Sequence, residues 1–167
     1  KALGKPVGRS LVDEQQLEQC LTILRKAQEY NVTVIMPRDY LVAHHTYTGT
    51  LTYVNAEQFP HEEVGISIGD QTVDHIAPHI QHAGTIFYNG AMGMLERPDT
   101  LHGMKQILEL MTQTKALTVL GGGSSAAVAQ HYNLVDDFDH VSTGGGAMLA
   151  YLSGSKLPGL EALGINK

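Results

Sequence analysis

The chain has 167 residues, 43% of them hydrophobic, which suits about one domain with a substantial core. Its formal net charge is −6 and Lys and Arg form no cluster, which argues against nucleic-acid and membrane-surface partners. Cys20 is the only cysteine, so an internal disulfide is excluded and a reducing compartment is favoured. No apolar run reaches transmembrane length, so we expect a cytoplasmic protein. The absence of an initiator Met suggests a fragment or a cleaved chain.

The first predicted element is a helix. Ser10 resembles the first residue of a capping box. Leu17, Leu21 and Leu24 follow at helical spacing and predict an apolar face, with Cys20 packed into the core beside it.

A buried strand is expected next, over residues 32–36, ending at Pro37. Residues 38–64 are the least regular part of the chain, although residues 50–54 alternate like a half-buried strand. His44 and His45 lack a carboxylate or Cys at ligand spacing, so an exposed loop explains them better than a metal site.

Residues 64–69 form a short apolar segment, and a helix is predicted from Asp70. His75, His79 and His82 share the side of this helix opposite its apolar face. Two His residues four positions apart can hold a metal, but a solvated helix face explains them better.

The strand predicted over residues 85–88 runs into a loop that ends at Glu96. This loop can present Asn89 to a phosphate, Met94 and Leu95 to a base, and Glu96 to a ribose. The carboxylate suits the ribose because it accepts hydrogen bonds from both sugar hydroxyls. The alternative is an ordinary loop with a solvated Glu, leading into a helix that opens near Asp99.

Two strand–turn–helix units follow, and each turn carries three glycines. Residues 117–120 lead into Gly121–Gly123, and residues 138–143 lead into Gly144–Gly146. The first turn of a helix has unpaired N–H groups and the positive end of the helix dipole, which together favour a phosphate. One such turn alone is compatible with a plain tight turn, whereas two predict two helix N-termini facing one phosphate-bearing substrate.

Strands that alternate with helices predict an α/β fold, namely a Rossmann-like three-layer αβα arrangement with a mostly parallel sheet. Ligands of such sheets bind beyond the C-terminal strand ends, where Gly65, Asn89, Glu96 and both glycine turns are expected. No Walker A pattern is present. A weak dinucleotide fingerprint at residues 121–126 lacks its acidic partner, which argues against a dehydrogenase.

Together these motifs resemble phosphoglycerate kinase. Residues 88–96 are similar to its Trp-Asn-Gly-Pro-x-Gly-x-Phe-Glu loop, and residues 121–125 to its Gly-Gly-Gly-Asp-Ser/Thr turn. Residues 140–147 and 157–163 resemble its C-terminal signature, and residues 8–12 fit a helix start in the same domain. The resemblance implies that residues 1–167 are the C-terminal nucleotide-binding domain without its opening part, and that the N-terminal domain is lacking.

The resemblance also implies roles for individual residues. Glu96 would bind the ribose, while Gly65, Ile66 and Met94 would line the adenine pocket. The nucleotide phosphates would be held by Asn89 and by the backbone of Gly122, Gly123, Ser124 and Ser125. The catalytic group would be Gly144, Gly145 and Gly146, which would approach the transferring phosphoryl group. Arg97 is the nearest candidate for a basic phosphate contact.

The implied activity is the glycolytic transfer of a phosphoryl group between 1,3-bisphosphoglycerate and ADP, giving 3-phosphoglycerate and ATP with Mg²⁺. The resemblance implies an intact protein that is a monomer, whereas this chain alone would be inactive. Ser124 and Ser67 stand where the family has Asp, so no protein ligand for the metal is predicted. A non-catalytic nucleotide-binding or structural remnant of the family is therefore the alternative.

Overall fold

The computed structural model describes residues 1–165 and divides into two compact units. The first unit comprises residues 1–78 and 92–104, and the second comprises residues 79–91 and the chain from Lys105 onward. Among residues 1–165, none of the helices has the length and apolar character that crossing a bilayer requires.

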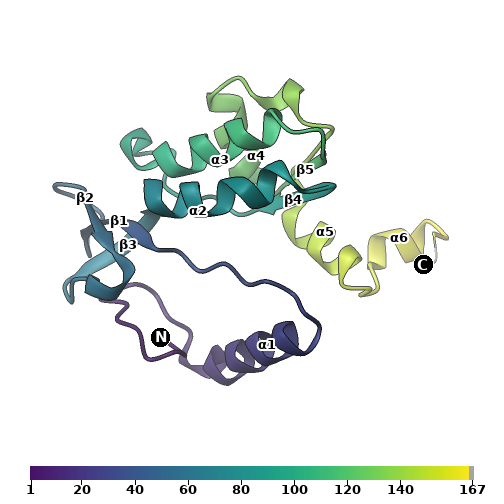
Figure 1. Ribbon diagram of the computed structural model, residues 1–167. Coiled ribbons are helices and arrows are strands. Elements are labelled where there is room, and N and C mark those ends of the chain that lie inside the picture. The colour runs from purple at the N-terminus through teal and green to yellow at the C-terminus, as the bar shows by residue number, and fades with distance from the viewer. Residues whose placement is uncertain (166–167) are drawn as a thin grey trace. The chain divides into compact units, whose positions relative to one another are not determined.

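The first unit contains an antiparallel sheet in the order β2–β1–β3 (Figure 1). Its strands are β1 (Asp39–His44), β2 (Thr52–Asn55) and β3 (Glu63–Ile68). The central strand β1 pairs with both neighbours, so that Leu41 lies opposite Tyr53 and Ser67. The alternation at residues 50–54 correctly predicted β2, whereas β1 lies in the stretch that the sequence left irregular.

Helix α1 (Leu17–Glu29) confirms the predicted first helix, but its start differs from the prediction. A short 3₁₀ turn, η1 (Glu14–Gln16), precedes the helix, and the Asp13 carboxylate accepts a hydrogen bond from the Gln15 N–H. The predicted cap, Ser10, instead accepts a hydrogen bond from the Gly65 N–H at 3.0 Å. No residue of α1 is buried, and Cys20 is exposed, so its predicted core position is wrong.

Residues 32–36 do not form the predicted strand. They run as a coil between α1 and β1 (Figure 1), and no backbone hydrogen bond joins residues 33–36 to another described segment. Val32, Val34 and Met36 are 59%, 44% and 47% exposed. A strand needs a neighbour for its N–H and C=O groups, and the described part of the first unit offers none to this segment.

Helices α2 (Asp70–Gln81) and α3 (His102–Thr112) confirm two further predicted helices. The chain also forms two 3₁₀ turns here. Turn η2 (Ala56–Gln58) follows β2, and turn η3 (Pro98–Thr100) precedes α3. The buried carboxylate of Asp39 accepts hydrogen bonds from the N–H groups of Gln71 and Thr72 and from the Thr72 hydroxyl. This carboxylate therefore caps the first turn of α2 from strand β1.

The second unit contains a parallel sheet in the order β4–β5–β6. Its strands are β4 (Thr85–Asn89), β5 (Leu117–Gly121) and β6 (His140–Ser142). The helical elements are α4 (Gly123–His131), η4 (Val135–Asp137), α5 (Gly145–Leu152) and α6 (Pro158–Ala162). The α/β class and a parallel sheet flanked by helices are thus confirmed, although the first unit adds an antiparallel sheet.

Strands β5 and β6 are joined at their starts by Thr118 and Asp139. The N–H and hydroxyl of Thr118 donate to Oδ2 of Asp139 at 2.7 and 3.0 Å, and the Asp139 N–H donates to the Thr118 hydroxyl at 3.2 Å. The Thr118 N–H and then its hydroxyl hold the pKa of Asp139 below its usual value, because they stabilise the charged carboxylate.

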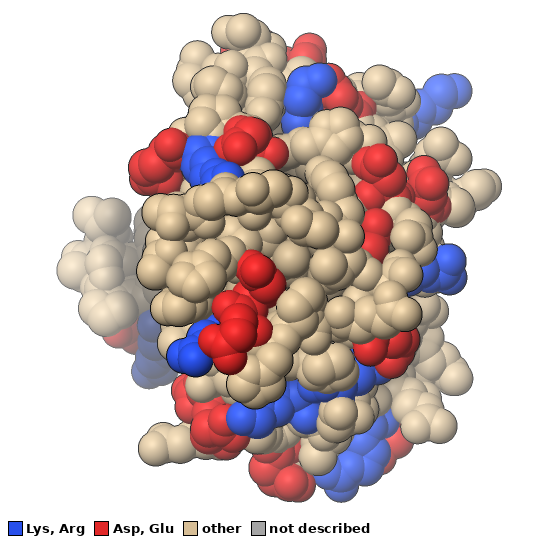
Figure 2. Space-filling model, turned by 90° about the vertical axis from the view of Figure 1, so that its left-hand side faces the viewer, with Lys and Arg blue, Asp and Glu red and all other residues tan. Residues whose placement is uncertain are grey.

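Charged side chains of both signs are interspersed on the face shown in Figure 2. Within the first unit, Lys5 pairs with Glu57 at 2.6 Å and Arg9 pairs with Glu62 at 2.7 Å.

Candidate functional site

In the second unit, the C-terminal ends of the three parallel strands lie side by side. Asn89 ends β4 and lies opposite Gly121, which ends β5, and Gly121 lies opposite Ser142, which ends β6. The N–H of Gly122 donates to the carbonyl of Ser142 at 2.8 Å. The two glycine turns therefore begin at one sheet edge, as the sequence predicted.

The two turns touch backbone to backbone. A Cβ atom at Gly145 would lie 2.9 Å from Cα and 3.4 Å from N of Gly122. Gly122 also has φ +93°, in the left-handed region that side chains disfavour. These two positions need glycine because a side chain at either one would strain the backbone or push the turns apart.

The side chain of Asn89 lies at the junction of the two turns. Its Oδ1 atom is 3.3, 3.1 and 3.2 Å from the positions that Cβ atoms would take at Gly121, Gly122 and Gly145. Asn89 is itself exposed. The arrangement is a cradle of backbone and one amide side chain, open to solvent.

Ser125 and Ser124 are neighbours in the first turn of α4 but differ in environment. Ser125 is 0% exposed, and its Oγ atom accepts a hydrogen bond from the Gly90 N–H at 3.0 Å. Ser124 is exposed, as are Gly123 and Gly144. The structure thus places the hydroxyl of Ser125 inside the protein and leaves Ser124 at the surface.

The N-terminal turns of α4 and α5 are suited to an anion. Neither helix has an acidic residue in its first turn, and no side chain caps either one. Their first N–H groups and dipoles therefore favour a phosphate. A magnesium ion held by protein carboxylates does not fit these turns, and no group of three or more His, Cys, Asp or Glu suited to a metal occurs within residues 1–165.

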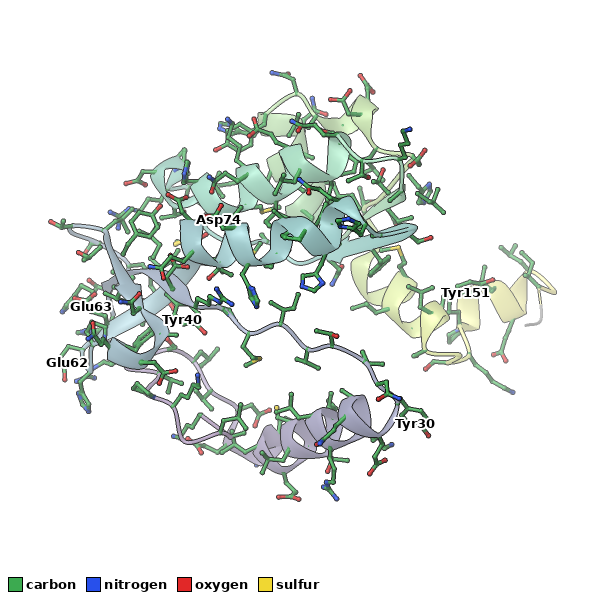
Figure 3. The ribbon with its side chains drawn as sticks, in the orientation of Figure 1. Tyr30, Tyr40, Glu62, Glu63, Asp74 and Tyr151 are labelled. Carbon is green, nitrogen blue, oxygen red and sulfur yellow. The ribbon has the colours of Figure 1, made fainter. Side chains whose placement is uncertain are left out.

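In the first unit, Gly65 lies inside β3 and not beyond a strand end, so its predicted place is wrong. Gly65 borders a mostly apolar cavity of about 350 Å³, and the hydroxyl of Ser67, also at this cavity, is buried without a hydrogen-bond partner. Tyr40, which Figure 3 labels on β1, meets the ring of Phe59 edge-on at 5.4 Å. The other lining residues include Ser10, Leu11, Ile66 and Met92.

Sequence reasoning missed most of this cavity. Met92 lines it, whereas the predicted Met94 does not. The Met94 N–H instead donates to the Thr100 hydroxyl at 2.8 Å. Leu11 and Phe59 carried no signal in the sequence that separates a cavity wall from ordinary core.

Glu96 and Arg97 follow in the same unit. Glu96 is exposed, as its predicted ribose role requires. The guanidinium of Arg97 donates to the carbonyls of Tyr47 and Gly49 at 3.0 and 2.6 Å and pairs with Asp99 at 3.3 Å. Arg97 is therefore engaged within the protein, and nothing in the structure supports its candidate role as a phosphate contact.

In the second unit, the structure thus brings the predicted phosphate residues Asn89, Gly122 and Ser125 together with the predicted catalytic residue Gly145. The predicted base and ribose residues Gly65, Met94 and Glu96 belong to the first unit.

A protein-family model described as phosphoglycerate kinase matches residues 1–155, which is most of the chain. The chain belongs to the phosphoglycerate kinase family.

Curated relatives and solved structures agree with this assignment. The phosphoglycerate kinase of Anaeromyxobacter dehalogenans strain 2CP-C is 40% identical over 163 residues, which are 97% of this chain and 41% of that protein. The phosphoglycerate kinase of Borreliella afzelii is 37% identical over 161 residues, which are 96% of this chain and 41% of that protein.

The solved phosphoglycerate kinase of Coxiella burnetii matches 96% of this chain and 42% of its own, with a TM-score of 0.87 and 30% identity. The solved phosphoglycerate kinase of Pyrococcus horikoshii matches 98% of this chain and 42% of its own, with a TM-score of 0.75 and 31% identity. The chain therefore spans less than half the length of these phosphoglycerate kinases.

Proposed function

We propose that the chain is part of the C-terminal nucleotide-binding domain of a phosphoglycerate kinase and that it supplies part of the ADP/ATP site. The observation that carries this proposal is the junction of two glycine turns at adjacent parallel strand ends, with Oδ1 of Asn89 between them. This junction joins two helix N-termini, which suit a substrate with several phosphates.

Within this site, Asn89 and the N-terminal turn of α4 hold the nucleotide phosphates. The residues of that turn are Gly122, Gly123, Ser124 and Ser125. Gly144, Gly145 and Gly146 open α5, where their N–H groups approach the phosphoryl group that is transferred.

The cavity bordered by Gly65 and Ile66 holds the base of the nucleotide, because it is mostly apolar and walled partly by aromatic side chains. Met92 replaces Met94 as the methionine of this wall. Glu96 accepts hydrogen bonds from the ribose hydroxyls.

In the intact protein, the reaction is phosphoryl transfer between 1,3-bisphosphoglycerate and ADP, a step of glycolysis, and we place it in the cytoplasm. Because the chain spans 41% of its curated relatives, this activity is assigned to the intact protein, as a monomer, and not to the chain alone. Magnesium, when bound, would neutralise the phosphate charges, and Ser124, in place of a carboxylate, would offer it only a neutral hydroxyl.

Glu96→Gln in the chain of 167 residues tests the nucleotide site. Losing a charged hydrogen-bond partner is expected to weaken Mg·ADP binding by roughly 1.5–3 kcal/mol, measured by calorimetric titration. Thermal stability is expected to stay constant because Glu96 is exposed.

Glu161→Gln is the matched control, since Glu161 is also exposed and lies on α6. Equal ADP affinity in wild type and Glu96→Gln would contradict the ribose role. A wild-type chain that does not bind ADP would contradict the proposed nucleotide site itself.

The second candidate is a nucleotide-binding or structural remnant without catalysis, which the exposed Ser124 favours because it is a neutral and weak metal ligand. Ser124→Asp tests whether residue 124 lies near the metal. We expect this variant to bind ADP more tightly with Mg²⁺ and less tightly without it, because the new carboxylate attracts the ion and repels free phosphates.

Ser124→Asn is the neutral control, of nearly the same size as Asp. The same dependence on Mg²⁺ in all three proteins would show that residue 124 is not near the metal. Turnover by the intact protein would rule out the non-catalytic remnant.

A further inference from the structure

We propose that Ser125 is a positioning residue, whose hydroxyl holds the Asn89–Gly90 peptide so that the Asn89 amide stays between the two glycine turns. The functional meaning of this position rests on the proposed phosphate role of Asn89. The contact itself does not depend on that role.

The positioning contact joins α4 to the end of β4. Oγ of Ser125 accepts a hydrogen bond from the Gly90 N–H at 3.0 Å, and Gly90 follows Asn89 directly. Gly90 has φ +102°, so the chain turns sharply where the hydroxyl holds it. Without this acceptor, the N–H of a left-handed glycine has no fixed partner and the preceding residue gains rotational freedom.

The Asn89 side chain is exposed, and its oxygen lies in the space that three glycines leave open. Its Oδ1 atom lies within 3.3 Å of the Cβ positions of Gly121, Gly122 and Gly145. A small rotation of the Asn89–Gly90 peptide therefore moves the amide out of the junction or into the glycine backbone. Accurate placement matters because a binding group displaced by about 1 Å loses much of its effect.

Ser125 does not serve as a phosphate ligand through its side chain. The residue is 0% exposed and its oxygen already accepts the Gly90 N–H, whereas the next residue toward the turn, Ser124, is exposed. The sequence resemblance gave both serines the same role, and their burial separates them.

The test compares Ser125→Ala, Ser125→Thr and the control Ser155→Ala, which removes an exposed hydroxyl elsewhere in the second unit. Hydrogen exchange at the Gly90 amide and the side-chain amide resonances of Asn89 are measured by NMR in the full chain. In Ser125→Ala we expect about tenfold faster hydrogen exchange at the Gly90 amide and shifted Asn89 side-chain resonances. In Ser125→Thr we expect the exchange rate and the resonances to match those of wild type.

Mg·ADP affinity and the exchange of core β5 amides are measured on the same proteins. We expect affinity to fall about fivefold to tenfold in Ser125→Ala, with core exchange unchanged and with recovery in Ser125→Thr. A general loss of stability would instead raise exchange throughout β5.

Unchanged Gly90 exchange in Ser125→Ala would overturn the positioning role. Faster Gly90 exchange with unchanged ADP affinity would also overturn it, because Asn89 would then not depend on Ser125 for binding. If the wild-type chain does not bind ADP, the proposed nucleotide site fails, and the Gly90 and Asn89 signals still decide whether Ser125 holds the peptide.

Discussion

Asn89 occupies space that three glycines leave open, and this single amide oxygen links the two turns of the second unit. The sequence predicted both the glycines and the asparagine, because the residue types suit phosphate binding. It did not predict that the turns touch each other, since the distance between two loops follows from strand pairing and not from the composition of either loop.

Gly145→Ala and Gly146→Ala form a matched pair in one helix turn. A Cβ at Gly145 would meet the Gly122 backbone at 2.9 Å, whereas a Cβ at Gly146 would meet nothing within 4 Å. We expect Gly145→Ala to destabilise the chain by about 1–3 kcal/mol through this clash. Gly146→Ala is expected to stabilise it by up to about 1 kcal/mol, because Ala loses less backbone entropy than Gly.

Urea denaturation of both variants measures these opposite effects. If Gly145→Ala were as stable as Gly146→Ala, the close contact between the turns would be absent in solution.

Ser124 and Ser125 mark the limit of prediction at the residue scale. Adjacent residues in a helix point in different directions, so one is exposed and the other is buried. Which of the two serines faces the solvent depends on how helix α4 is oriented against the sheet, and the sequence alone does not give that orientation. Ser10 is similar, because its hydroxyl meets Gly65 instead of capping the local helix.

At the scale of elements, strands are predicted well only where their partners are nearby. Residues 117–121 and residues 32–36 both read as apolar strands, yet only the former pair with neighbours, β4 and β6. The residue types of a segment therefore indicate whether it favours an extended backbone. Whether the segment becomes a strand depends on a neighbouring strand that pairs with it. Strand β1 was missed because Pro37 was taken as the end of a strand, whereas a strand begins two residues later.

The hydrogen bonds between Thr118 and Asp139, at the starts of β5 and β6, are sensitive to the charge of Asp139. The hydrogen bonds from Thr118 lower the pKa of this carboxyl in the folded chain, so ionised Asp139 stabilises the fold above the pKa of the unfolded state. This contribution is lost as the pH falls through the folded pKa. We expect Asp139→Asn to lower the melting temperature at pH 7 and to differ less from wild type as the pH approaches that of acid unfolding.

Melting curves between neutral and acidic pH measure this difference. The control is Asp136→Asn, whose exposed carboxylate lies in η4. A gap between wild type and Asp139→Asn that is constant with pH would contradict the charged hydrogen bonds from Thr118.

At the scale of the whole molecule, the predicted site residues belong to different units. The phosphate residues lie in the second unit and the base and ribose residues in the first. The sequence order suggested one continuous sheet, because helices and strands alternate along the chain. The first unit instead contains an antiparallel sheet, in which consecutive strands are not separated by helices. Gly65 lies within β3 of this sheet and pairs with Val42.

Residues 32–36 also affect the behaviour of the whole chain. The backbone of residues 33–36 has no hydrogen bond to another described segment, and Val32, Val34 and Met36 are exposed. Like an unprotected sheet edge, such a segment can pair with another chain. We expect the purified chain to self-associate as its concentration rises and Val34→Lys to reduce this association. Light scattering over a concentration series measures the effect.

Leu163→Lys is the control, because Leu163 is 76% exposed outside the segment. Equal reduction by both variants would show that general surface hydrophobicity, and not residues 32–36, drives the association.

The contact between Gly122 and Gly145 has an evolutionary consequence. A side chain at Gly145 would need the space that the Gly122 backbone occupies, whereas Gly122 is restricted by its own φ of +93° and by the nearby Asn89 side chain. A change at Gly122 that moves its backbone therefore alters which changes Gly145 tolerates. Substitutions at the two positions are therefore expected to be coupled, although the positions lie in separate glycine turns of the chain.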